Sequence, residues 1–344
     1  MMDAMKKNTF LAIKKYLQVR NIADYRYDQI LNAVFEQKIT EFKQMIGLPK
    51  KLRLELENEF GQIMRLQKVR EQTSDKAKKV LFELEDKKRI ESVLMHYKSW
   101  DTLCISTQVG CKMNCDFCAT AKIGFKRNLT VDEIVSQPLF FLLQDSQLHS
   151  LSLMGMGEPL DNPGTFSALR LLINKKMFNF GSRNINVSTI GIIPGLKKLS
   201  DQFPQINIAL SLHTAIPQQR KELIPASAQY PLEQIMAVLD KHIRRTKRKV
   251  FLAYLMLKDV NDTHEHLKKL VALIKSRQDI SYLYHLNLIR YNPVAAVETK
   301  YQASEQERLD YFKEKLEKNH IQFSVRKALG QHIEAGCGQL KAQY

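Results

Sequence analysis

The sequence lacks long apolar runs, internal repeats and low-complexity tracts. A membrane-spanning helix needs about 18 or more consecutive apolar residues, and the apolar runs in this chain, such as residues 139–143, are much shorter. The opening residues MMDAMKKNTF contain no apolar segment of the kind that signal peptides carry. We therefore expect a soluble, cytoplasmic protein that makes no contact with a membrane.

Cysteine is scarce and odd in number. Five cysteines cannot all pair, so they do not form the even disulfide framework of a small secreted protein. In a reducing cytosol, cysteines serve as free thiols, metal ligands or catalytic groups. Cys111, Cys115 and Cys118 fall within eight residues of one another, and this grouping indicates a metal site.

Acidic residues are few compared with basic ones. The chain has 36 Asp and Glu against 53 Lys and Arg, a formal net charge of +17. Such an excess is typical of proteins that bind nucleic acid; the alternative is a basic surface without a dedicated partner. The run KHIRRTKRK at 241–249 holds six basic residues and no acidic one, so it is either a phosphate contact or a solvated helix end.

Residues 1 to about 90 are predicted to be helical. Apolar residues recur at helical spacing in FLAIKKYLQV and YDQILNAVFEQ, and LPKKLRLELENEF contains a proline that can begin a helix. We therefore expect residues 1–92 to form a small helical accessory domain that contacts nucleic acid. Residues 93–344 are expected to form the main domain.

From about residue 100, apolar strand-like runs alternate with amphipathic helical stretches. This alternation predicts an α/β fold with a parallel sheet of βαβ units, whose functional end is the carboxyl edge of its strands. Thr130 and Glu133 form a capping box at the start of the first helix. The six predicted strands lie in TLCIST, LHSLSLMGM, INVSTIG, INIALSLH, KVFLAYLML and YLYHLNLIRY.

The motif CKMNCDFC follows the first of these strands. A structural zinc site is closed by four Cys or His ligands, and the nearest downstream histidine is the distant His149. A bacterial ferredoxin would supply further cysteines at short spacing, and the sequence has none. A [4Fe–4S] cluster held by three thiolates, with one iron open to a substrate or cofactor, fits best. A non-catalytic RNA-binding protein with a structural zinc stays as the alternative.

Two further motifs, MGMGEP at 154–159 and CGQL at 337–340, accompany the three cysteines. Together they resemble the radical S-adenosylmethionine (SAM) rRNA adenine methyltransferases of the RlmN/Cfr family, and the resemblance covers nearly the whole chain. It implies a partial (β/α)6, TIM-like barrel, one [4Fe–4S] cluster on Cys111, Cys115 and Cys118, and two SAM molecules per turnover, one of them bound to the open iron.

The same resemblance implies a set of SAM contacts after successive strands. Taken singly, a Ser or Asn at a strand end is more often a turn former than a ligand contact. The implied contacts are Gly157, Glu158, Ser188, Ser211, Leu212, His213 and Asn292.

Three catalytic residues are implied as well. Cys337 matches the cysteine that first accepts a methyl group, and Cys104 matches the one that resolves the protein–RNA adduct and leaves a disulfide. Glu91 matches the general base that removes the adenine proton. Without the resemblance, Cys104 would be interpreted as a buried small hydrophobe and Glu91 as a solvated charge.

The implied substrate is adenosine 2503 of 23S rRNA. NLIRYNP at 287–293 and STIGIIP at 188–194 look like the Cfr branch of the family, which methylates C8 and confers resistance to several ribosome-targeting antibiotics. The alternative is the C2 methylation of the RlmN branch, which often extends to adenosine 37 of tRNA. We further expect a monomer and an electron donor such as flavodoxin or ferredoxin.

Overall fold

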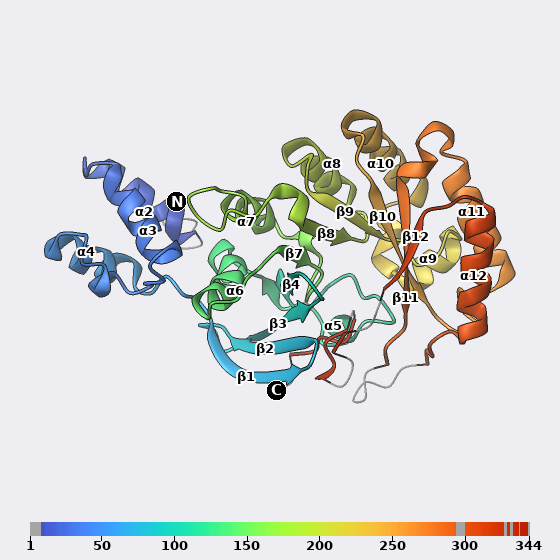
Figure 1. Ribbon diagram of the computed structural model, residues 1–344, viewed down its shortest axis with the longest axis horizontal. Coiled ribbons are helices and arrows are strands. Elements are labelled where there is room, and N and C mark those ends of the chain that lie inside the picture. The colour runs from blue at the N-terminus through green and yellow to red at the C-terminus, as the bar shows by residue number, and fades with distance from the viewer. Residues whose placement is uncertain (1–7, 294–299, 327–328, 331–332, 337, 343–344) are drawn as a thin grey trace.

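The computed structural model describes residues 8–293, 300–326, 329–330, 333–336 and 338–342 (Figure 1). N-terminal helices lie at one end of the molecule, and a single long sheet flanked by helices forms the rest. In the described part of the chain, no helix is both long and apolar enough to span a membrane.

The N-terminal helices are α2 (Thr9–Val19), α3 (Tyr25–Phe35) and α4 (Lys50–Phe60), with a 3-10 turn at Phe42–Gln44, and they confirm the helices expected in this part of the sequence. Each buries an apolar face against the others. The residues buried between them include Phe10, Ile13, Ile30, Val34, Phe42 and Leu56.

Helix α2 is anchored to the main sheet domain through Thr9. The backbone N–H and the hydroxyl of Thr9 both donate to the buried carboxylate of Asp132, at 2.7–2.9 Å. The Phe35 ring lies edge-on to Phe178, with 4.9 Å between the ring centroids. The N-terminal helices therefore pack onto the main domain.

The expectation of helix is wrong for residues 67–92. This stretch forms the antiparallel strands β1 (Gln67–Ser74), β2 (Ala77–Glu83) and β3 (Arg89–His96). Turn residues at 75–76 and 84–88 interrupt any helix, and pairing of β3 with β4 (Asp101–Cys104) adds all three strands to the main sheet. The predicted domain boundary at 92/93 lies inside β3.

Seven strands of the ten-stranded sheet are parallel, in the order β4, β7, β8, β9, β10, β11, β12. The six predicted strands are confirmed, and the sheet order is linear rather than closed, so the prediction of a partial, TIM-like barrel is confirmed too. The strands after β4 are β7 (Ser150–Leu153), β8 (Ile185–Thr189), β9 (Asn207–Ser211), β10 (Val250–Met256), β11 (Tyr284–Arg290) and β12 (Phe323–Arg326).

Helices flank these strands on the outside (Figure 1). The predicted capping box is present, because Thr130 Oγ1 accepts from Glu133 N and the Glu133 carboxylate accepts from Thr130 N. The helices are α6 (Val131–Leu143), α7 (Gly164–Leu172), α8 (Ile193–Gln202), α9 (Pro217–Leu223), α10 (Leu232–Thr246), α11 (His264–Lys275) and α12 (Gln306–Lys318).

Short segments complete the architecture. The strands β5 (Gln108–Val109) and β6 (Arg127–Asn128) form a two-stranded hairpin, and helix α5 (Ala119–Lys122) lies in the loop between them. Four further 3-10 turns span Pro159–Asp161, Ser182–Asn184, Pro225–Gln229 and Gln278–Leu283.

Candidate active site

A cavity of about 160 Å³ lies at the carboxyl ends of the parallel strands. This is many times the roughly 10–15 Å³ that a single water needs. The predicted site residues that line it are Cys111, Cys115, Cys118, Gly157, Glu158, Ser188, Ser211 and His213. They come from the ends of different strands, so the fold gathers most of the predicted set at one place.

The three cysteines lie in the loop closed by the β5–β6 hairpin. Gly110, next to Cys111, has φ of +72°, and a Cβ on it would lie 1.7 Å from the Gly124 carbonyl oxygen, so the two ends of the loop meet without room for a side chain. Within the described residues, no three Cys, His, Asp or Glu side chains converge closely enough to hold a single metal ion. The three cysteines all line the same cavity.

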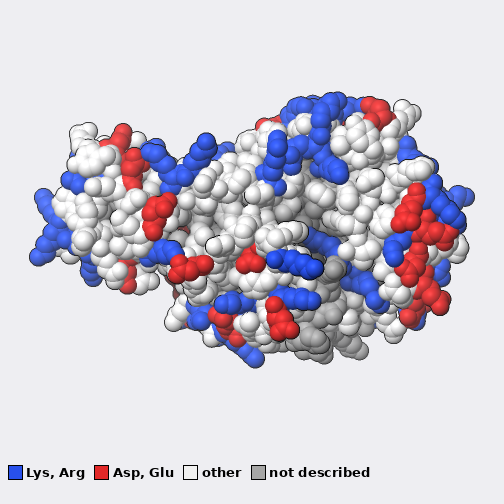
Figure 2. Space-filling view, viewed as in Figure 1, with Lys and Arg blue, Asp and Glu red and all other residues white. Residues whose placement is uncertain are grey.

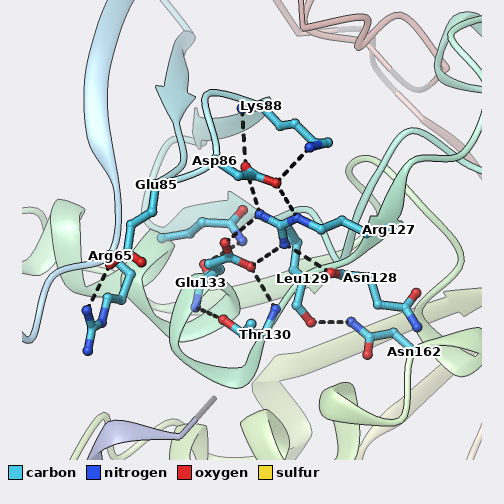
Figure 3. A network of polar contacts seen from close by, with 11 residues as sticks. Arg65, Glu85, Asp86, Lys88, Arg127, Asn128, Leu129, Thr130, Glu133 and Asn162 are labelled. Atoms are coloured by element: carbon cyan, nitrogen blue, oxygen red, sulfur yellow. Dashed lines mark hydrogen bonds and ion pairs between the residues drawn. The ribbon is translucent and has the colours of Figure 1, made fainter. Parts of the chain in front are cut away.

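Arg127 fixes the base of this cysteine loop (Figure 3). Its guanidinium donates two hydrogen bonds to Asp86, in the turn between β2 and β3, and two to Glu133, at the start of α6, at 2.7–3.0 Å. This arrangement holds the pKa of Asp86 well below its usual range, chiefly through the hydrogen bonds from Arg127. The hairpin, the cysteine loop and α6 are thereby joined at one point.

Burial keeps the thiols of Cys111 and Cys115 protonated in the absence of a ligand. It raises the pKa of Cys111 to about 12 and that of Cys115 well above its ordinary value. A soft metal centre that takes thiolates would release these protons and stabilise the thiolates in the buried site. The donor set is made of sulfur, which suits an iron–sulfur cluster.

Glu158 places a carboxyl group in the wall of the cavity. It is 4% exposed, and burial raises its pKa to about 7. The backbone N–H groups of Ile190 and Leu160 donate to it at 3.0 and 3.3 Å. A cationic ligand group, such as an ammonium, would lower the pKa of this carboxyl group and favour its ionised form.

Gly157 lets the chain pass close to Gln108. Its φ is +95°, and a Cβ there would lie 2.4 Å from the Gln108 Cβ, so glycine is required. Gln108 accepts from Glu158 N at 2.9 Å and donates to Asp161 Oδ2 at 2.9 Å. Sequence reasoning did not identify Gln108, which connects the hairpin below the cysteines to the Gly-Glu motif.

His213 reaches the cavity as a neutral imidazole. Burial, with Arg220 nearby, lowers its pKa to about 3. Leu255 N donates to His213 Nδ1 at 3.0 Å, so the ring proton lies on Nε2. Ser188 and Ser211 lie beside each other, 3.3 Å apart at their hydroxyls. The Leu212 side chain is fully buried in the core and lies outside the described lining of the cavity.

Arg220 is a second residue that sequence reasoning missed. It is 2% exposed, and its Nη2 donates to the carbonyls of Ile190 and Ser211 at 2.7 and 3.0 Å. Burial lowers its pKa to about 10. It lies in the polar segment PQQRKEL, in which the sequence carries no signal of a buried side chain.

Glu91 is buried rather than solvated. Its carboxylate forms an ion pair with Lys79 at 3.1 Å and accepts from the backbone N–H groups of Lys341 and Ala342 at 2.8 and 2.9 Å. Lys79 and Glu91 are 5% and 3% exposed. Cys104 pairs with Val93, two residues from Glu91 on β3, so Cys104 and Glu91 lie on the same face of the sheet.

Cys337 lies outside the described residues, but its neighbours are placed. Ala119 N donates to the Gly338 carbonyl at 2.8 Å, and Thr120 Oγ1 donates to the Leu340 carbonyl at 2.6 Å. Ala119 and Thr120 directly follow the last cysteine of the loop. The C-terminal segment is therefore bound to the cysteine loop on one side and to Glu91 on the other.

Two predicted residues or segments lie elsewhere. Asn292 is 6% exposed and lies outside the described lining of the cavity, in a neighbouring groove. The basic run 241–249 precedes the first residue of β10 and so lies at the amino end of the strands, opposite the cavity. Figure 2 shows Lys and Arg gathered over α8 and α10, where this run lies.

Comparisons with known proteins agree with this geometry. The family model described as the radical SAM superfamily matches residues 105–273. The ribosomal RNA large subunit methyltransferase Cfr of Staphylococcus warneri is 43% identical, over 100% of this chain and 99% of its own. The protein of the same name from Lachnoclostridium phytofermentans is 44% identical over 98% of each chain.

This chain belongs to the Cfr family of radical SAM enzymes. The predicted relationship to the RlmN/Cfr family is thus confirmed. The crystal structure of a radical SAM methyltransferase from Sphaerobacter thermophilus has a TM-score of 0.90 and 33% identity to this chain, and the match covers 98% of this chain and 99% of the other. Membership of the superfamily implies a [4Fe–4S] cluster and SAM, and the three thiols that line one cavity with the Glu158 carboxyl fit both.

Proposed function

We propose that this protein methylates C8 of adenosine 2503 in 23S rRNA through a methyl group carried on Cys337. The proposal is carried by the position of the C-terminal segment, which is bound both to the cysteine loop, through Ala119 and Thr120, and to Glu91. The full-length relatives named as large-subunit rRNA methyltransferases support the RNA substrate.

In this proposal each residue has a defined task. Cys111, Cys115 and Cys118 hold one cluster, and Glu158 binds the SAM amino group. Gly157, Ser188, Ser211, Leu212, His213 and Asn292 are proposed to complete the SAM contacts. When bound, the cluster and SAM supply the radical chemistry. Cys337 carries the methyl carbon, Cys104 attacks the Cys337 sulfur to release the product, and Glu91 accepts the adenine proton.

Glu91 can act as a base only when its carboxylate is accessible. The amides of Lys341 and Ala342 occupy one of its oxygens and Lys79 pairs with the other, so the proposal requires that one of these oxygens be exposed to the adenine when the RNA binds. The proposal also includes two SAM molecules per turnover, an electron donor such as flavodoxin or ferredoxin, a monomeric enzyme in the cytoplasm, and antibiotic resistance in cells that produce it.

Mass spectrometry of rRNA nucleosides from cells with and without the protein tests the proposal. We expect a methyl group on C8 of adenosine 2503, no such product with the Cys337→Ala variant, and cofactor cleavage retained by that variant. Methylation at C2, or of tRNA adenosine 37, would assign the RlmN-type activity instead. A colourless protein that contains zinc and makes no methylated adenosine would contradict the proposed methyltransferase activity.

A further inference from the structure

A second hollow lies beside the cavity at the same edge of the sheet. It has a volume of about 640 Å³ and lies between the ends of β11 and β12 and the inner side of α12. We call it the side groove. Its lining includes Arg290, Asn292, Gln306, Lys313 and Arg326.

The side groove adjoins the candidate active site at two points. Arg326 lines both the groove and the cavity, and its Nη1 lies 3.4 Å from the sulfur of Met154 in the cavity wall. Gln339, two residues after Cys337, donates to the Pro293 carbonyl of the groove at 2.9 Å. A chain molecule that places one unit in the cavity would therefore lay its next units along the groove.

The charge of the side groove is positive. Its described lining has three cationic side chains and no Asp or Glu. The hydrogen-bond partners of Arg290 are neutral oxygens of Gln306 and Ser304, at the long distances of 3.5 and 3.4 Å. These contacts leave the Arg290 guanidinium with strong donors for an anionic ligand.

Lys313 is the cation with an acidic neighbour. It pairs with Asp310 at 2.7 Å. The side chains of Lys313 and Asp310 are 39% and 51% exposed, so water screens the pair and another anion can take the place of Asp310. The acidic side chains of α12 gather along the outer side of the molecule (Figure 2). Of the cations in the described groove lining, Lys313 therefore shares an exposed ion pair with an acid of α12, whereas the hydrogen-bond partners of Arg290 are neutral oxygens.

We propose that the side groove binds the sugar–phosphate backbone of the RNA strand next to the adenosine whose base enters the cavity. This inference rests on the proposed function. A base must leave its stack to enter a pocket, and its flanking phosphates then remain outside, where Arg and Lys hold them. Such contacts carry no sequence information, so they position the strand rather than select it.

Binding of a 23S rRNA fragment that contains adenosine 2503 tests the groove, with the full chain and several salt concentrations. We expect Arg290→Ala and Lys313→Ala each to weaken binding about 3- to 10-fold and to lower the salt slope by about one. Turnover should show a higher KM at an unchanged kcat, and Arg290→Lys should recover part of the affinity. Lys318→Ala, on the same helix and paired with Glu314, is the matched control and should change neither.

Unchanged affinity, KM and salt slope in both groove variants would overturn the proposal, as would an equal loss in Lys318→Ala. Binding of an acidic peptide that depends on Arg290, with RNA binding unaffected, would assign the groove to a protein partner. These outcomes differ from a failure of the proposed function, in which the wild-type protein itself methylates no RNA.

Discussion

The two ends of the parallel strands handle charge in opposite ways. At the carboxyl end, Glu158, His213 and Arg220 are between 2% and 6% exposed, and backbone groups hold them. At the amino end, Arg244 pairs with Asp279 at 2.6 Å, with 53% and 64% of their side chains exposed. The fold has removed water from the first set and left it around the second, so only the first set has a strong electrostatic influence on a ligand.

The largest effect should come from the buried ion pair of Lys79 and Glu91. Lys79→Met leaves the Glu91 carboxylate buried without its cation, so we expect the free energy of unfolding to fall by about 3–5 kcal/mol. Urea denaturation of the cofactor-free protein measures it. The control is Lys78→Met, because Lys78 is the neighbouring residue and pairs with the more exposed Glu71. An equal loss in both variants would show that burial of the Lys79–Glu91 pair is not the cause.

Arg220→Met should give the next largest loss. It leaves the carbonyls of Ile190 and Ser211 without their donor inside the protein, and we expect a decrease of about 2–4 kcal/mol by the same measurement. A decrease below about 0.5 kcal/mol would show that water replaces the guanidinium there, and the contrast between the two ends would be weaker than proposed.

His242 tests whether the amino end contains a buried titrating group. It lies 2.9 Å from Ser200 Oγ, and burial, followed by Arg245 and Arg248, lowers its pKa to about 4. The neutral ring is favoured in the folded protein, so this contribution to stability is present above pH 6.5 and is lost as the pH falls toward 4. Stability should therefore fall less steeply in His242→Gln over this range, and parallel curves would contradict the assignment.

The smallest effect is expected for Arg244→Met at the amino end. Water screens an exposed ion pair, so the free energy of unfolding should stay at the wild-type value within the error of the measurement. Thermal and urea denaturation of Arg244→Met and Arg220→Met under the same conditions compares the two ends directly. A loss as large as that of Arg220→Met would show that exposure does not separate the two ends.

Sequence patterns predicted the elements that are buried on both sides. The six strand-like runs were recognisable because a parallel sheet covered by helices needs apolar strands. The capping box was recognisable because Thr130 and Glu133 are three residues apart and bond to each other locally. Strand β12 was missed because it is short and half exposed, and α9 because it is mostly polar. The strands β1 to β3 were missed because pairing with β4 adds them to the sheet, and local spacing carries no record of that pairing.

Some residues of the candidate site are marked by short sequence motifs, and others are not. Cysteine spacing and the Gly-Glu motif are local, and the structure brings both to one cavity. Arg127, Gln108 and Arg220 act through contacts with residues far away in the chain, so no short motif marks them. Asn292 follows a strand as the motif predicts, yet it lines the side groove, because the strand end alone does not fix which hollow a side chain meets.

The bonds from Lys341 and Ala342 to Glu91 span separations of 250 and 251 residues. During synthesis the domain folds from its N-terminus while the last residues are still being added. Glu91 therefore lacks these two amide donors until Lys341 and Ala342 have been synthesised. The contact joins an early strand of the sheet to a segment about 250 residues later, so we expect it to form late in folding.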